Sequence, residues 1–61
     1  MSAKEIKMLR LRLEMSQKEF AETIGYETEG AVSLIERGLR EPSGPVLRRL
    51  RELAESATAA K

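Results

Sequence analysis

Apolar residues recur at spacings of three and four in four stretches of this chain, which is the spacing of one face of an α-helix. The first stretch predicts a helix from about Lys4 to Leu13. Ser2 precedes it and can accept a hydrogen bond from a free backbone N–H of the first turn. The inward face of this helix consists of Ile6, Leu9 and Leu13.

Two further apolar residues of the first helix, Met8 and Leu11, lie off its inward face. In one interpretation they widen the buried stripe. In the other they form a small exposed patch that contacts a second copy of the protein. The spacing leaves both interpretations open.

The second stretch carries the clearest start and stop signals. The residues S-Q-K-E from Ser16 to Glu19 match the capping box, in which the serine is the N-cap and the glutamate is the third helical residue. Met15 and Phe20 stand at the positions of a hydrophobic staple. Gly25 is expected to end the helix, because glycine enters the left-handed region at little cost. The inward face consists of Phe20, Ala21 and Ile24.

A turn and a third helix follow, and the helix is expected over about residues 28–37. Thr28 is the expected N-cap, and Gly38 is expected to close the helix. Glu29 in the first turn and Arg37 in the last turn suit the helix dipole. The turn consists of Tyr26, Glu27 and Thr28, and the inward face of the helix consists of Val32 and Ile35.

The fourth stretch follows a loop at residues 40–45 that is rich in turn-forming residues. Pro45 suits the first turn of a helix, where its missing N–H has no partner to lose. The predicted helix ends at about Glu55, and residues 56–61 are expected to be a disordered or frayed tail. Its apolar stripe consists of Val46, Leu47, Leu50, Leu53 and Ala54.

The predicted architecture is one all-α domain over residues 1–55, a compact bundle of four short helices with no fifth helix. Composition agrees, because 41% hydrophobic and 34% charged residues are typical of a folded domain. The chain contains no apolar run near the ~20 residues that span a bilayer and no signal-peptide pattern. We therefore expect no membrane contact and a cytoplasmic location.

Several residue types that carry chemistry are missing from the 61-residue sequence, which has no His, Cys, Asp, Asn or Trp. General acid–base and nucleophilic catalysis mostly use His, Cys or a carboxylate beside a partner base. A helical unit of this length also has little room for a substrate pocket of ~300 Å³. We therefore expect no enzyme activity, no catalytic residues, no metal, no cofactor and no small-molecule substrate.

Two short helices joined by a tight turn form the helix-turn-helix pattern, predicted here from Ser16 to Gly38. In such a unit the second helix lies in the major groove of DNA with its N-terminal residues near base edges. Over about residues 6–54 the chain resembles the Cro/XRE family of phage repressors, whose domains are of the lambda-repressor type. The residues that carry this resemblance are Leu9-Arg10, Ser16-Gln17-Lys18-Glu19-Phe20-Ala21-Glu22, Ile24-Gly25, Val32-Ser33, Ile35-Glu36-Arg37-Gly38 and Pro42-Ser43.

The resemblance implies binding to double-stranded operator DNA, usually as a dimer on a palindrome. It implies that Gln17 holds a phosphate and that the exposed start of the third helix reads bases. It also implies that Arg10 pairs with Glu36, and we interpret both residues as structural. The implied protein is a repressor of a phage, plasmid or similar mobile element, acting at the nucleoid of a bacterial or phage-infected cell.

Three features depart from the family pattern. The interval from Gly25 to Val32 is one position longer than usual, so either the turn bulges or the third helix begins later. The fifth helix of the family has no sequence here to form it. The expected reading face contains none of the commonest base-reading side chains, which are Arg, Lys, Gln and Asn. This face consists of Thr28, Glu29, Gly30, Ser33 and Leu34.

The charge of the chain is low for a DNA-binding protein. The net charge is only +1, and residues 19–36 contain five glutamates and no Lys or Arg. In the functional interpretation, Glu29 accepts a bond from a cytosine amino group, Ser33 serves either base type, and Gly30 allows close approach. In the alternative, the glutamates are a solvated face and Gly30 only accommodates the longer turn. Phosphate contacts are expected from Gln17, Lys18, Arg37 and Arg40, beside backbone N–H groups.

Two expectations concern partners. The small core and the apolar pair Met8 and Leu11 predict a weak homodimer. A rival function is a protein-interaction module on the same scaffold, such as part of an antitoxin or an adaptor, because fold alone does not determine function. The basic residues of the fourth helix are expected to form a solvated face, and the alternative is that one of them reaches a phosphate or a glutamate of a partner. These residues are Arg48, Arg49 and Arg51.

Overall fold

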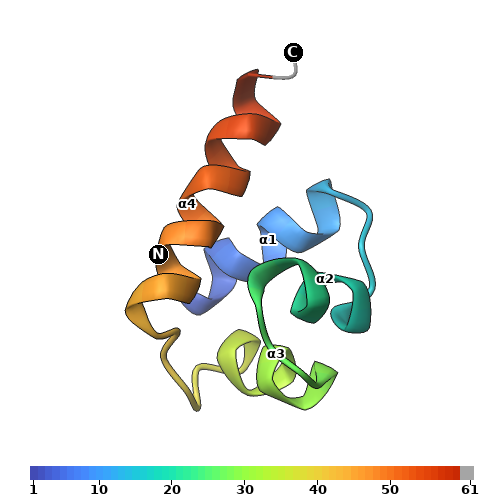
Figure 1. Ribbon diagram of the computed structural model, residues 1–61, viewed down its shortest axis with the longest axis vertical. Coiled ribbons are helices and arrows are strands. Elements are labelled where there is room, and N and C mark those ends of the chain that lie inside the picture. Colours follow the sequence, from blue (N-terminus) through green and yellow to red (C-terminus); the bar gives the residue numbers. More distant parts are fainter. Residues whose placement is uncertain (60–61) are drawn as a thin grey trace.

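The computed structural model describes residues 1–59 of the chain. Within that range the chain folds into four helices with no strand and no fifth helix, as predicted (Figure 1). They are α1 (Ala3–Arg12), α2 (Gln17–Ile24), α3 (Glu29–Glu36) and α4 (Gly44–Ala59). Helices α2 and α3 pack on each other, and α4 packs against α1 and α2. None of the helices in this part of the chain is long and apolar enough to cross a membrane.

The first two helices begin with the same side-chain cap. The Ser16 hydroxyl accepts from the Glu19 backbone N–H at 3.0 Å, and the Glu19 carboxylate accepts from the Ser16 N–H at 2.9 Å. This is the predicted capping box. The predicted Ser2 cap is also confirmed, and Glu5 completes a second capping box that we did not predict.

Three helices end in the same hydrogen-bonded turn, the Schellman motif. Each motif needs one residue in the left-handed region, and Gly25 (φ 99°) and Gly38 (φ 77°) supply it after α2 and α3, as predicted. After α1 the residue is Glu14 (φ 58°), which the sequence did not predict. The closing N–H···O bonds join Met15 to Arg10 at 3.2 Å, Tyr26 to Ala21 at 2.8 Å and Leu39 to Leu34 at 2.9 Å.

The core lies where the inward faces of the four helices meet, and the predicted apolar stripes supply it. Met8 and Leu11 do not take part, because 54% and 50% of their surfaces are exposed. The interpretation that they widen the buried stripe is therefore wrong. The core consists of Ile6, Leu9, Phe20, Ala21, Ile24, Val32, Ile35, Val46 and Leu50, with Leu13, Met15, Leu53, Ala54 and Ala57 half-buried against it.

The ends of α1 and α4 differ from the predicted ends. Helix α1 stops at Arg12, one residue early. Helix α4 continues to Ala59, so the expected tail is helical over residues 56–59, and residues 60–61 lie outside the described part of the chain. The reason is that Ala57 prolongs the inward stripe and packs against the core. The last turns of α4 extend past the other helices (Figure 1).

Candidate nucleic-acid interface

The α2–α3 unit is joined by residues 25–28, and α3 begins at Glu29. Thr28 has the extended conformation of an N-cap (φ −133°, ψ 152°), as predicted. Its side chain does not make the expected capping hydrogen bond. The turn therefore consists of residues 25–28, and the first helical residue of α3 lies four positions after Gly25.

Helix α3 is buried on one side and exposed at its start. Val32 and Ile35 are buried, as predicted, together with Ala31. Of the five expected base-reading residues, three are exposed and two are half-buried. The exposed ones are Thr28, Glu29 and Gly30, and the half-buried ones are Ser33 and Leu34. The first turn of α3 is therefore the part that can approach a flat or grooved partner.

Gly30 has no structural need to be glycine. Its φ is not positive, unlike those of Gly25 and Gly38. A Cβ at this position would meet only the Thr28 hydroxyl oxygen, at the ordinary contact distance of 3.8 Å. The interpretation that Gly30 accommodates the longer turn is therefore wrong.

The implied ion pair between Arg10 and Glu36 is present and nearly buried. Arg10 Nε lies 2.6 Å from Glu36 Oε2, and the two side chains are 12% and 4% exposed. Arg10 Nη2 donates to Glu36 Oε1 at 3.3 Å, and Nη1 donates to the Met15 carbonyl at 2.9 Å. The pair thus ties α1 to the end of α3 and to the residue before the α2 cap.

Gln17 also donates to this pair, which the sequence did not predict. Its Nε2 lies 3.1 Å from Glu36 Oε1. The side chain expected to hold a phosphate is therefore anchored to the carboxylate at the end of α3. No short-range signal could have shown this bond, since its two residues are 19 positions apart.

A surface hollow brings together three of the expected site residues, Lys18, Thr28 and Glu29. Glu22 and Glu27 complete its lining. Three carboxylates face one ammonium group there, so the hollow is acidic. This acidic character agrees with the excess of glutamates over residues 19–36 of the sequence.

Arg40, an expected phosphate contact, is held by Tyr26, for which the sequence predicted only a place in the turn. Its guanidinium carbon lies 4.9 Å from the centre of the Tyr26 ring, a cation–π contact. Tyr26 also packs against the core, and its hydroxyl oxygen is buried with no hydrogen-bond partner within residues 1–59. The contact links the loops before and after α3. Arg37 is exposed, and its Nε lies 3.4 Å from the Ser33 carbonyl.

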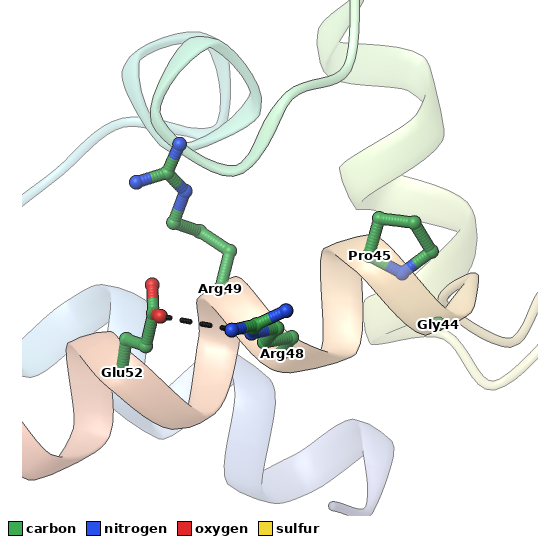
Figure 2. A pocket seen from close by; sticks show the side chains of 5 residues that line it. All are labelled: Gly44, Pro45, Arg48, Arg49 and Glu52. Carbon is green, nitrogen blue, oxygen red and sulfur yellow. Dashed lines mark ion pairs between the residues drawn. The ribbon is translucent and has the colours of Figure 1, made fainter.

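Two of the basic residues of α4, Arg48 and Arg49, line one surface pocket (Figure 2). Figure 2 shows Arg48 beside Glu52 while Arg49 extends in another direction. The Arg48–Glu52 pair is 4.0 Å long and its side chains are 84% and 58% exposed, so it contributes little. These side chains and Arg51 remain exposed, as predicted for a solvated face.

Together, a capped α2, a tight turn and an α3 with an exposed first turn define a helix-turn-helix domain. Residues 6–55 match the family model described as helix-turn-helix. The chain therefore belongs to this family, and its resemblance to Cro/XRE repressors is confirmed. The family is one of DNA-binding regulators and not of enzymes. No curated protein and no solved structure matches the chain.

Proposed function

We propose that this protein is a sequence-specific regulator that binds double-stranded operator DNA with α3 in the major groove. The observation that carries the proposal is the exposed first turn of α3 on a helix whose opposite side is buried in the core. Such a helix can enter a groove while its domain stays outside. The proposed action is repression, by a dimer that covers a palindromic operator in the cytoplasm of a bacterial cell.

Phosphate contacts are assigned to the start of α2 and to the loop after α3. The Ser16 cap uses the Glu19 N–H, so the N–H groups of Gln17 and Lys18 have no partner inside the helix. A helix N-terminus with free N–H groups favours an anion. The side chains of Gln17 and Lys18 act at this point, and Arg37 and Arg40 act at the other end of α3.

Base contacts are assigned to the exposed first turn of α3 and to two half-buried residues of its next turn. The Glu29 carboxylate can only accept hydrogen bonds, and the major-groove donor of a G·C pair is the cytosine amino group. Ser33 can donate or accept, and Leu34 can contact a thymine methyl group. Thr28 and Gly30 lie beside Glu29 and are exposed.

The test is selection of bound duplexes from a random library, followed by measurement of affinity against salt. With Lys18, Arg37 and Arg40 from both copies on phosphates, the slope of log K against log salt is about −5. A palindromic consensus with two half-sites one helical turn apart would support a dimer. Absence of any salt-dependent enrichment would refute the proposal.

The acidic hollow at Lys18, Thr28 and Glu29 favours one rival, a surface for a basic protein partner. The variant Glu29→Lys separates the two functions. If α3 reads DNA, the selected consensus changes, because a lysine donates to guanine where the glutamate accepted from cytosine. If the hollow binds a basic protein, the variant loses that partner and its DNA behaviour stays unchanged. Glu55→Lys on α4 is the matched control for the change of charge.

For the dimer, the candidate contact is the exposed pair Met8 and Leu11 on α1. Burial of these side chains against a second copy would stabilise the dimer by about 25 cal/mol for each Å² of apolar surface removed from water. The double variant Met8→Lys/Leu11→Lys should lower the sedimentation coefficient of the complex with operator DNA. Only monomer at high micromolar concentration, free and on DNA, would rule the dimer out.

A further inference from the structure

Gln17, the first residue of α2, is anchored through its side chain to Glu36 at the end of α3. Its Nε2 donates to Glu36 Oε1 at 3.1 Å, and the same oxygen accepts from Arg10 Nη2 at 3.3 Å. We propose that Glu36 is a positioning residue, which holds the Gln17 amide in the orientation that donates to a DNA phosphate. This inference rests on the proposed DNA binding and states how one of its contacts is prepared.

The chemistry of the two groups allows only one orientation of the amide. Nε2 of a glutamine carries two N–H donors, and its oxygen is an acceptor. An ionised carboxylate only accepts, so Glu36 excludes the rotamer that turns the Gln17 oxygen inward. One N–H is used in this bond, and the second is left for an acceptor outside the domain.

Arg10 neutralises the charge of the Glu36 carboxylate, which lies close to the proposed phosphate site. An unpaired Glu36 would repel a phosphate, because its side chain is only 4% exposed and poorly screened by water. Arg10 donates to both carboxylate oxygens, at 2.6 and 3.3 Å, and offsets this charge. Its bond to the Met15 carbonyl, at 2.9 Å, fixes the guanidinium beside the start of α2.

The benefit of the anchor is the ordering that takes place before DNA arrives. Fixing one rotamer-rich side chain on binding lowers affinity by about 2- to 10-fold. A Gln17 already held by Glu36 avoids most of this loss. The phosphate bond itself, a hydrogen bond to a charged group, corresponds to about tenfold in affinity or more.

A double-mutant cycle on the folded protein tests the inference. Gln17→Ala is measured in the unmodified protein and in Arg10→Met/Glu36→Met, which replaces the pair by apolar side chains of similar length. Arg10→Lys is the matched control, because it keeps the Glu36 carboxylate, which only accepts, and a positive charge beside it. Affinity for the selected duplex is measured, and circular dichroism confirms that each variant is folded.

In the unmodified protein and in the control, Gln17→Ala should lower affinity by about tenfold. In Arg10→Met/Glu36→Met the same change should cost only about twofold, since a free side chain must be ordered on binding. The salt slope should stay constant, because Gln17 is neutral and Arg10 with Glu36 has no net charge. Equal losses in all backgrounds would overturn the inference and leave the DNA-binding function standing. Absence of DNA binding by the unmodified protein would overturn both.

A second measurement needs no variant. The sequence has one glutamine and no asparagine, so Gln17 gives the only side-chain amide pair in an ¹⁵N spectrum. In the free protein this amide should be as ordered as the backbone, with an order parameter of about 0.85. Addition of the duplex should shift one of its two protons much more than the other. A mobile amide in the free protein, with an order parameter below about 0.6, would overturn the inference.

Discussion

Replacing Gly30 by alanine should have opposite effects on stability and on DNA binding. Gly30 is the second residue of α3 and is exposed. Its φ is not positive, and a Cβ would meet one atom at 3.8 Å, so alanine fits without strain. A glycine in a helix is less favourable than alanine by about 0.5–1 kcal/mol. We expect Gly30→Ala to stabilise the domain by about that amount.

For a domain of this size, 1 kcal/mol corresponds to a rise of about 4–8 °C in Tm. The assay is thermal unfolding followed by circular dichroism at 222 nm. Gly25→Ala is the matched control, because the same chemical change there must adopt φ 99°. It should destabilise the domain by about 1–2 kcal/mol, the cost of the left-handed conformation for a residue with a Cβ.

The same methyl group should weaken operator binding, since under the proposed function it stands where α3 meets the base edges. Overpacking of a closely fitted contact typically costs about 1–3 kcal/mol. A lower Tm for Gly30→Ala would refute the helical assignment of the backbone there. A higher Tm with unchanged operator affinity would show that Gly30 lies outside the interface, and the reading face would then have to start elsewhere on α3.

Three further predictions concern the fold. Glu14→Gly should stabilise the domain by about 0.5–1 kcal/mol in urea unfolding, because relief of a left-handed residue outweighs the added freedom of the unfolded chain; a loss of stability would contradict the strain. Tyr26→Phe should stabilise the domain by about 1 kcal/mol, because it removes a buried hydroxyl that has no hydrogen-bond partner in the described part of the chain. Tyr26→Leu removes the ring as well, so Arg40 should lose its cation–π contact in that variant. The pKa of Glu5 is lowered by the hydrogen bonds of its carboxylate to the Ser2 backbone and side chain. This bond therefore adds stability above the unfolded pKa of Glu5, and the contribution disappears as pH falls through the lower folded value; an NMR titration of Glu5 that shows an unshifted pKa would disprove it.

The features predicted correctly from sequence are those with short-range causes. The Ser16 capping box depends on residues three positions apart, and Gly25 ends α2 through its own conformational freedom. Glu14 shows the limit of this reasoning. It occupies the same left-handed position as the glycines, but nothing in its residue type marks it. The end of α4 was missed because a small residue, Ala57, continues the apolar stripe.

The site was predicted less completely because its contacts join distant parts of the chain. The pairing of Arg10 with Glu36 came from a family resemblance and not from spacing. The Gln17 bond to Glu36 and the Arg40 contact with Tyr26 depend on how α2, α3 and the loops pack. Residue types alone could identify the expected site residues, but they could not show what holds them.

The charge around α3 also constrains how such a regulator distinguishes its operator from other DNA. With a net charge of +1 and an acidic hollow at the start of α3, binding through phosphates alone must be weak. Under the proposed function, Glu29 gains a bond only where the amino group of a cytosine or an adenine faces it, and a guanine or thymine leaves the carboxylate unpaired in the groove. A mismatch of this kind costs about 1–3 kcal/mol. The low net charge therefore lowers the affinity for DNA of any sequence, and the proposed contact of Glu29 with a base increases the difference in affinity between sequences.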